Sequence, residues 1–157
     1  DFIKDVLVQH GEIKFWSVRM RPAKPLAFGT IKDPKGRMVP HIGLPGNPVS
    51  ALVAFEQFCR PAILRMLGRT ELTKPTVTAI LRGKIINYDG RRVYARVVVG
   101  KTEENYYAVP TGPQGSNILT SISRANGLAI CPQDVPEIND GQIVIVQMLD
   151  WPEEVEV

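Results

Sequence analysis

Cysteine and histidine are scarce in this sequence, which has two of each among 157 residues. The cysteines, Cys59 and Cys131, lie far apart in apolar contexts and match no spacing typical of metal ligands. The histidines, His10 and His41, form no cluster with them. We therefore expect no metal centre built on cysteine or histidine. We predict two buried thiols in a reducing compartment rather than a disulfide.

Long apolar runs and a strong charge of one sign are also missing. No stretch of about 18 apolar residues is present, and no basic, apolar and small-residue leader precedes the first predicted strand, so we expect neither a membrane span nor a signal peptide. The net charge of +3 is too small to indicate nucleic-acid binding, and aromatic residues do not alternate with basic ones. The 44% hydrophobic content fits a cytoplasmic protein with one ordinary domain or two small ones.

The sequence does contain a strand that runs into a helix through a turn suited to an anion. Residues 41–50 read His-Ile-Gly-Leu-Pro-Gly-Asn-Pro-Val-Ser. Asn47 is a favourable N-cap after Pro45-Gly46, and Pro48 suits the first helical position. The free N–H groups of the first turn, the helix dipole and the Ser50 hydroxyl would then face a bound oxyanion. A well-capped junction without a ligand is the alternative interpretation.

Two further segments could contribute to an oxyanion site. Arg21 and Lys24 lie three residues apart on a connection stiffened by Pro22 and Pro25, just before an apolar run. Gly112-Pro113-Gln114-Gly115-Ser116 can present backbone N–H groups and a hydroxyl. Solvated basic residues and a glycine-rich turn are the plainer interpretations of the two segments.

The first half of the sequence combines short strands with one long helix. We expect an amphipathic helix over residues 2–10, and a strand over 12–20 with Ile13, Phe15 and Val18 inward. Two further strands are predicted over 26–32 and 38–44, with Asp33-Pro34-Lys35-Gly36 as the turn between them.

A helix is predicted from Pro48 to Leu67, bent by Pro61 and ended by Gly68 as a C-cap. Apolar residues recur along it at helical spacing, and we expect this stripe to be core: Leu52, Phe55, Cys59, Ile63 and Met66.

After residues 73–75 the hydrophobic period changes from helical to alternating. A small barrel or sandwich is predicted from five short strands, with a loop over 115–124 that opens a short helix. The strands are expected over 76–83, 92–100, 106–110, 127–132 and 142–148. The acidic residues from Asp150 to Glu156 indicate a solvated terminus.

Two motifs carry a resemblance to a known family. Met-Arg-Pro-Ala-Lys-Pro-Leu-Ala-Phe-Gly at 20–29 and Gly-Leu-Pro-Gly-Asn-Pro-Val-Ser-Ala at 43–51 resemble the molybdopterin molybdenumtransferase family, MoeA and the gephyrin E domain. Tyr94-Ala95-Arg96 and residues 111–119 are similar to its C-terminal barrel. Residues 1–5 look like the end of its Gly-x-Ser-x-Gly-x-x-Asp motif, so the chain is expected to start in mid-domain.

The resemblance implies a fold and a division of the chain. Residues 1–72 are expected to be the C-terminal part of a MogA/MoaB-like, molybdopterin-binding α/β domain, residues 73–150 a small all-β barrel domain, and residues 151–157 an acidic tail. The chain departs from the usual Met-Lys-Pro-Gly-Lys-Pro motif at two positions. Arg21 keeps the charge of lysine on a planar fork. Ala23 in place of glycine is expected to reduce backbone freedom only.

The resemblance also implies an activity, the magnesium-dependent insertion of molybdate into adenylylated molybdopterin with release of AMP. Lys24, Arg96 and Asp1 are the implied catalytic residues, and Asp1 would also lie near magnesium. By positional match, contacts with molybdate or molybdopterin are expected from seven residues: Arg21, Lys24, Pro25, Asn47, Ser50, Arg96 and Ser116.

Two other hypotheses remain open from the sequence. Gephyrin-like members use the same fold as a scaffold that binds receptor peptides, without transferase activity. A generic nucleotide-binding protein is disfavoured, because neither Gly-x-x-x-x-Gly-Lys-Ser/Thr nor Gly-x-Gly-x-x-Gly occurs. The resemblance further implies a homodimer, and we expect the isolated chain to be inactive.

Overall fold

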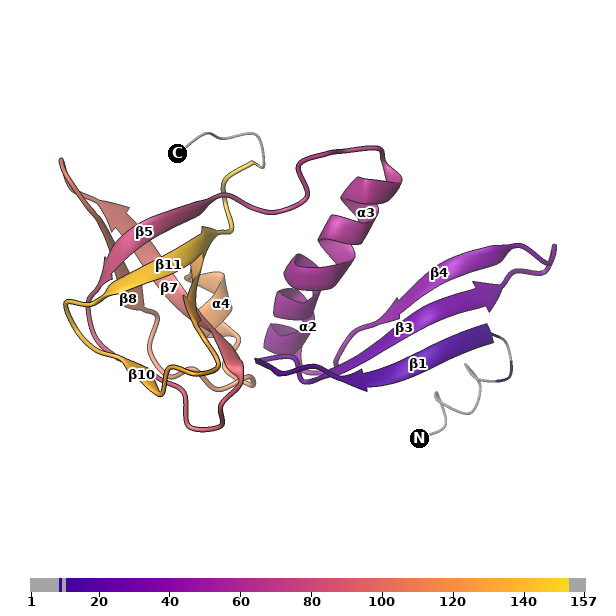
Figure 1. The fold of residues 1–157 in the computed structure, drawn as a ribbon, viewed down its shortest axis with the longest axis horizontal. Coiled ribbons are helices and arrows are strands. Elements are labelled where there is room, and N and C mark those ends of the chain that lie inside the picture. Colours follow the sequence, from indigo (N-terminus) through magenta and orange to yellow (C-terminus); the bar gives the residue numbers. More distant parts are fainter. Residues whose placement is uncertain (1–8, 10, 153–157) are drawn as a thin grey trace.

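A computed structural model describes Gln9 and residues 11–152. The expected helix over 2–10, Asp1 and the last residues of the acidic tail lie outside the described residues, as does the side chain of Phe15. A three-stranded sheet and a helix form one unit, and a barrel forms the other, with the helix between the sheet and the barrel (Figure 1).

The sheet of the first unit is antiparallel, in the order β1-β3-β4. Its strands are β1 (Gly11–Ser17), β3 (Pro25–Lys32) and β4 (Met38–Gly43). The β3–β4 hairpin turns where predicted, because the Asp33 carboxylate accepts hydrogen bonds from the backbone N–H groups of Lys35 (2.9 Å) and Arg37 (2.8 Å) and Gly36 takes a φ of 78°. The predictions for 26–32 and 38–44 are confirmed to within a residue.

The single strand expected over 12–20 is wrong in its second half. β1 ends at Ser17, and a separate strand, β2 (Met20–Arg21), leaves this sheet. β2 pairs in parallel with β7 (Arg92–Lys101) of the barrel, Met20 opposite Arg92 and Arg21 opposite Val93. Met20 is only 4% exposed and packs in a cluster with residues of the helix and the barrel, so tertiary packing outweighs the local alternation.

The predicted long helix has three continuous parts: α2 (Pro48–Ala54), a π-helical segment η1 (Phe55–Cys59) and α3 (Arg60–Met66). The wide turn of η1 directly precedes Pro61, whose ring lacks an N–H to donate. Gly68 ends the helix as predicted, with a φ of 78°. Its N–H bonds to the Arg65 carbonyl and that of Arg69 to the Leu64 carbonyl, each at 3.0 Å, as in a Schellman motif.

The expected core stripe of this helix is mostly wrong. Leu52 and Ile63 are 47% exposed and Met66 is 69% exposed, whereas Val49 and Val53 are buried. Two causes combine here. The helix is apolar on more than one face, and the π-helical turn adds a residue, which rotates later positions away from a 3.6-residue stripe. Of the predicted stripe, Cys59 is buried and Phe55 is partly buried.

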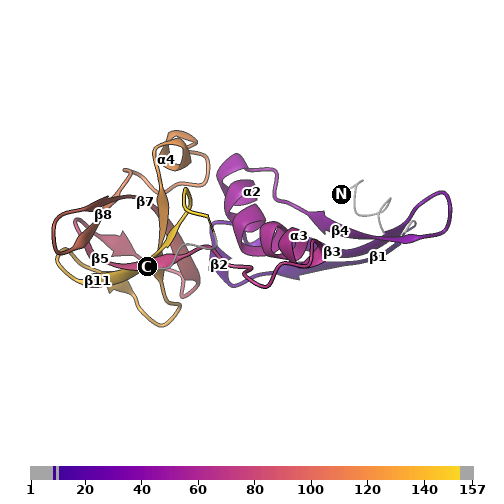
Figure 2. The same cartoon turned by 90° about the horizontal axis from the view of Figure 1, so that it is seen from above.

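The second unit is a small barrel. Its sheet has the order β2-β7-β8-β5-β11-β9, and a β7–β9 pairing closes it (Figure 2). The main strands agree with the five predicted ones: β5 (Thr76–Leu81), β7 (Arg92–Lys101), β8 (Tyr106–Pro110), β9 (Gly127–Cys131) and β11 (Ile143–Met148). Two short paired strands were not predicted, β6 (Ile85–Ile86) and β10 (Glu137–Ile138). The short helix predicted in loop 115–124 is α4 (Thr120–Ser123).

The barrel core is formed by alternate strand residues such as Val77, Leu81, Val97 and Val146, each at most 2% exposed. Both cysteines are buried free thiols, as predicted, and burial raises the pKa of each. Among the described residues, no helix is long and apolar enough to cross a membrane.

The end of the described chain packs on the barrel, although a solvated terminus was expected there. The Trp151 ring meets the Tyr106 ring edge-on at 6.2 Å, and Trp151 packs against the barrel core. Its carbonyl accepts a hydrogen bond from Lys74 Nζ at 2.6 Å.

A second hydrophobic cluster joins the two units. Its buried members are Met20, Ala23, Val53, Ala54, Tyr94 and Leu128. Ala23 has a φ of 79°, which corrects the expectation that alanine here only reduces backbone freedom. A residue with a Cβ is strained by about 1 kcal/mol in the left-handed region, where glycine is not.

Candidate functional site

A pocket of about 610 Å³ lies where the two units meet. The loop after β2, the first turn of α2, the β6–β7 turn and the loop before α4 all contribute to its wall. Four cationic residues line it, and no carboxylate-bearing residue is among the described residues that do. These cations are Arg21, Lys24, Lys84 and Arg91.

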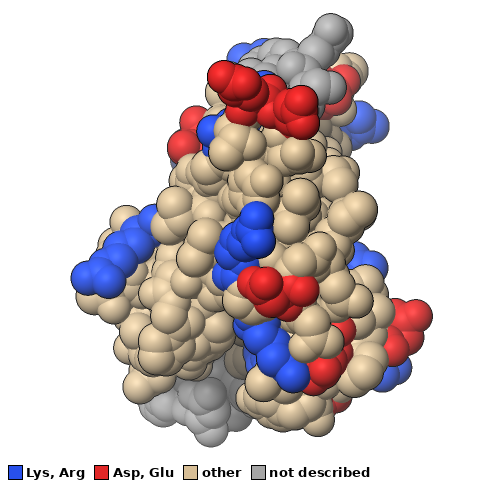
Figure 3. Space-filling view, turned by 90° about the vertical axis from the view of Figure 1, so that its left-hand side faces the viewer, with Lys and Arg blue, Asp and Glu red and all other residues tan. Residues whose placement is uncertain are grey.

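This concentration of one charge differs from the surface at the barrel end of the molecule. There, basic and acidic side chains lie beside one another and most of the surface is uncharged (Figure 3). The net charge of +3 therefore gave no indication of a local cationic site. Carboxylates that do not line the pocket compensate part of this charge, because Lys84 pairs with Glu137 at 2.7 Å and Asp89 pairs with Arg21 and Arg91. Lys24 is the pocket cation without a carboxylate partner among the described residues, and an anion in these partly desolvated surroundings is attracted more strongly than in bulk water.

The loop after β2 brings two of the predicted residues to the wall, Lys24 and Pro25. The Val18 N–H donates to the Lys24 carbonyl at 2.8 Å, which closes the loop and fixes its backbone. The Lys24 residue is exposed, and its ammonium group has no partner among the described residues, so it can reach a ligand in the pocket.

The start of α2 contributes Ser50, which is 7% exposed and lines the pocket. Asn47 is the backbone N-cap, with φ −74° and ψ 124°, and its carbonyl accepts from the Ala51 N–H at 2.8 Å. Its side chain makes no capping bond, in contrast to the expected N-cap role, and Asn47 is not among the residues that line the pocket. Its buried Oδ1 has no hydrogen-bond partner.

Arg96 lies behind the pocket wall rather than on it. The residue is 1% exposed, and its guanidinium donates to Ser121 Oγ (3.1 Å) and to the Gly115 carbonyl (3.2 Å). Burial and, secondarily, the charge of Arg21 lower its pKa to about 10. No ion pair joins it to a carboxylate in the described part of the chain. It supports the loop that carries Gly115 and Ser116, both of which line the pocket.

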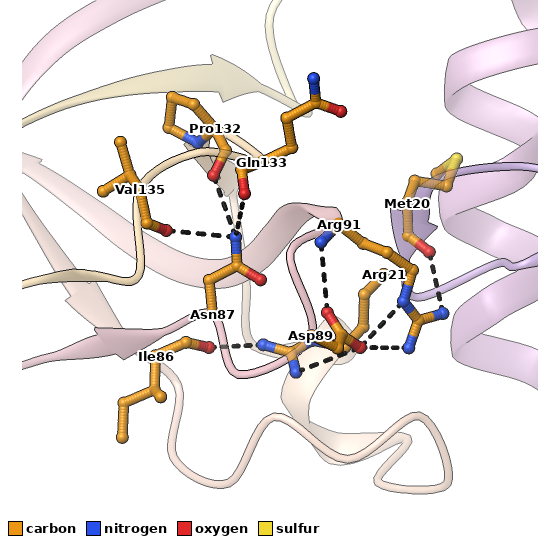
Figure 4. A network of polar contacts seen from close by, with 9 residues as sticks. All are labelled: Met20, Arg21, Ile86, Asn87, Asp89, Arg91, Pro132, Gln133 and Val135. Carbon is orange, nitrogen blue, oxygen red and sulfur yellow. Dashed lines mark hydrogen bonds and ion pairs between the residues drawn. The ribbon is translucent and has the colours of Figure 1, made fainter.

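Three pocket residues were not predicted from the sequence: Lys84, just before β6, and Tyr88 and Arg91 on the β6–β7 turn. In Figure 4 the Asp89 carboxylate lies between the guanidinium groups of Arg21 and Arg91. It accepts from Arg91 Nε at 2.8 Å and from Arg91 Nη2, and it lies 3.8 Å from Arg21 Nη1. The hydrogen bond from Arg91 is the main cause that lowers the pKa of Asp89. The sequence signal was present, as an aromatic and two cations around an Asp-Gly turn.

The structure thus brings five predicted residues to one pocket wall: Arg21, Lys24, Pro25, Ser50 and Ser116. Neither a histidine nor a carboxylate residue accompanies the two serines among the described lining residues. The site therefore has the chemistry to bind and orient an oxyanion through cations and hydroxyls, without an activated serine nucleophile.

Comparison with protein families gives two matches that together cover most of the chain. Residues 1–65 match a family described as a probable molybdopterin binding domain. Residues 78–149 match the MoeA C-terminal region, domain IV.

Individual relatives agree with these matches. The chain is 32% identical over 149 residues to a molybdopterin molybdenumtransferase of Haemophilus influenzae, a match that covers 94% of this chain and 36% of the relative. It is 31% identical to gephyrin of Dictyostelium discoideum, over 92% of this chain and 23% of gephyrin. A solved molybdopterin biosynthesis MoeA protein from Pyrococcus horikoshii superposes with a TM-score of 0.73 at 32% identity, over 94% of this chain and 34% of that chain. The chain therefore spans about a third of the length of the enzymes it matches.

Proposed function

Because the chain belongs to the MoeA family of molybdopterin molybdenumtransferases, we propose that its pocket holds molybdate beside adenylylated molybdopterin. The whole protein then inserts the metal into the dithiolene and releases AMP. The observation that carries this proposal is the convergence of four cations and two serine hydroxyls on one pocket that no carboxylate lines among the described residues. A tetrahedral dianion next to a phosphate-bearing pterin needs such surroundings.

The proposed roles follow from where the side chains lie. Lys24 and Arg21 attract and orient the dianion as charged donors, and the hydroxyls of Ser50 and Ser116 donate hydrogen bonds to its oxygens. Pro25 shapes the wall.

Two predicted residues act from outside the wall in this proposal. Arg96 holds the Ser116 loop in place from behind and adds a buried positive charge. Asn47 is the backbone N-cap of α2, and its carbonyl closes the first turn, which carries Ser50. The chain's contribution is thus binding and charge compensation, set up before the reactants meet.

Magnesium, which the resemblance implies, does not fit the described residues. Among them, no group of three acidic, histidine or cysteine residues could hold a metal ion. The two described carboxylates that contact the pocket cations are already paired, Asp89 with two guanidinium groups and Glu137 with Lys84. The predicted magnesium ligand Asp1 lies outside the described residues. We therefore assign no step to magnesium on this chain.

Titration calorimetry of the whole protein with molybdate, with sulfate as competitor, tests the proposal. Lys24→Ala is expected to weaken molybdate binding by about tenfold, because it removes a charge-assisted hydrogen bond worth about 1.5 kcal/mol. Lys35→Ala is the matched control, an exposed lysine of the β3–β4 turn away from the pocket, and should bind as wild type does. No molybdate binding by the wild-type protein, with or without the adenylylated pterin, would refute the proposed function.

The scaffold hypothesis predicts a different result in the same assay. A protein that only binds peptides does not need four cationic residues and two serines around one pocket, and this argues for the enzyme. The similarity to gephyrin is the observation that supports the scaffold hypothesis. Peptide binding without molybdate binding would favour it.

We also propose that the whole protein is a cytoplasmic homodimer. The family relationship supports the dimer, and light scattering of the whole protein measures it. A monomer that retains molybdenum insertion would contradict it.

A further inference from the structure

The Arg21 side chain is held by the other unit of the molecule. Its guanidinium donates to the Ile86 carbonyl, lies 3.8 Å from the Asp89 carboxylate and stacks 3.9 Å from the centre of the Tyr88 ring. The three partners lie at the end of β6 (Ile86) and on the β6–β7 turn (Tyr88 and Asp89) of the barrel, 65 or more positions further along the chain. The Arg21 side chain is only 18% exposed, so a long, flexible group has a fixed direction at the pocket wall.

Hydrophobic burial does not explain the position of Tyr88. The residue is 77% exposed and belongs to neither hydrophobic cluster, yet it lines the pocket. Its neighbour Asn87 anchors the turn, because this residue is 5% exposed and its Nδ2 donates to the carbonyls of Pro132 (3.0 Å) and Val135 (3.1 Å), as Figure 4 shows. The anchored turn therefore presents an exposed ring to Arg21 and to the pocket.

The chemistry of this contact favours arginine over lysine. A planar guanidinium stacks on an aromatic face and keeps its edge free for hydrogen bonds, whereas an ammonium group is a compact point charge. Position 21 is one of the two at which the chain departs from the family motif. Arg21 Nη1 is buried without a hydrogen-bond partner, because its 3.8 Å separation from Asp89 is too long for one. The N–H groups of Nη1 thus have no acceptor among the described residues.

We propose that Tyr88 is a positioning residue for Arg21. The ring fixes the plane of the guanidinium at the pocket wall, so that the Arg21 charge is held in place for a bound oxyanion. The affinity of the pocket for molybdate then depends on the β6–β7 turn as well as on the loop after β2. This inference rests on the proposed function, and it adds a residue for which the family motif gives no indication.

Calorimetry of the whole protein with molybdate, in two backgrounds, tests the inference. With Arg21 present, Tyr88→Leu is expected to weaken binding about threefold, the equivalent of one partly exposed cation–π contact, and Tyr88→Phe should restore it. In an Arg21→Lys background the Tyr88→Leu change should have no measurable effect. Tyr107→Leu is the matched control, because the Arg82 guanidinium lies 4.7 Å from the Tyr107 ring and neither residue lines the pocket.

The outcomes separate the two proposals. Equal losses from Tyr88→Leu in both backgrounds, or no loss in either, would overturn the positioning role while the proposed function stands. A loss as large with Tyr107→Leu would overturn it as well, since the effect would then be general. If the wild-type protein and Lys24→Ala both bind no molybdate, the proposed function fails, and the role of Tyr88 in molybdate binding fails with it.

Discussion

The two units of this molecule differ in how fully they bury their apolar residues. In β7 of the barrel, Val93, Ala95, Val97 and Val99 are all buried. In the other unit, Trp16 on β1 is 52% exposed and Phe28 on β3 is 45% exposed, and their rings lie 6.0 Å apart. The barrel closes on itself, so each inward face has a partner strand, whereas the β1-β3-β4 sheet has no such closure in the described residues.

The comparison shows when a hydrophobic pattern in the sequence predicts which residues are buried. A pattern identifies the apolar face of an element but not whether another element covers that face. In the barrel each inward face is covered by other strands of the same closed sheet, so every inward apolar residue is buried and prediction succeeded. For the helix, the buried face is the one that meets β2 and the barrel, a long-range contact that periodicity does not encode.

The largest expected effect comes from the same leucine-to-alanine change made in both units. Leu81→Ala, at a residue 0% exposed in the barrel, should lower the free energy of unfolding by about 3 kcal/mol. Leu52→Ala, at a residue 47% exposed on the helix, should lower it by about 1 kcal/mol or less. Denaturant unfolding followed by fluorescence measures both. Equal losses would show that the exposed helix face is buried in solution.

A glycine substitution should damage the sheet unit alone. A Cβ at Gly29 would lie 1.9 Å from the Glu12 carbonyl oxygen, so Gly29→Ala should push β1 from β3 at a cost of about 2 kcal/mol. The sequence has two tryptophans, Trp16 on β1 and Trp151 on the barrel, and single Trp→Phe variants let each unit be followed separately. The Trp16 transition should shift and the Trp151 transition should stay.

The control for that change is Gly46→Ala, because a Cβ at Gly46 meets no atom within 4 Å. A parallel shift of both tryptophan transitions in Gly29→Ala would mean that the two units unfold as one. The contrast drawn between them would then apply to burial and not to stability.

Much of the fold could be predicted because its signals are local. The strands β5 and β11, rich in β-branched residues, alternate between exposed and buried residues over their first four positions, and Asp33 to Gly36 encodes its own turn. What failed depends on distant partners. The end of the 12–20 strand joins β7, and β6 and β10 are only two residues each and exist because they pair with one another.

The residues of the site also fall into those that local sequence predicts and those that depend on distant contacts. The motif residues Lys24, Ser50 and Ser116 could be selected from the sequence, whereas Tyr88 and Arg91 reach the pocket only because β2 docks on the barrel. Arg96 was expected among the molybdate contacts, and the structure places it behind the wall. Spacing in the sequence cannot distinguish a residue that lines the pocket from one that holds the lining loop in place from behind.

A smaller effect is expected from the ion pair between the units. Arg91 and Arg21 hold the pKa of Asp89 below its usual range, so this carboxylate stabilises the folded state at neutral pH. That stabilisation is lost as pH falls below about 4, when the folded state must also take up the proton. Asp89→Asn should therefore unfold with a weaker dependence on acid than wild type. Denaturant midpoints measured from neutral pH to about pH 3 test this, with Asp134→Asn, which changes an exposed carboxylate, as control.

The smallest expected effect concerns Ala23, where the two units meet. Ala23→Gly removes the strain of a φ of 79°, about 1 kcal/mol, and also removes a buried methyl group worth about 0.8 kcal/mol. The two terms oppose each other, so the free energy of unfolding should change by less than about 0.5 kcal/mol. Ala23→Val is the informative companion, because a β-branched residue is strained further at positive φ and overfills the cluster with Met20 and Val53. A marked gain in stability from Ala23→Gly would mean that the methyl group packs poorly and that backbone strain dominates at this junction.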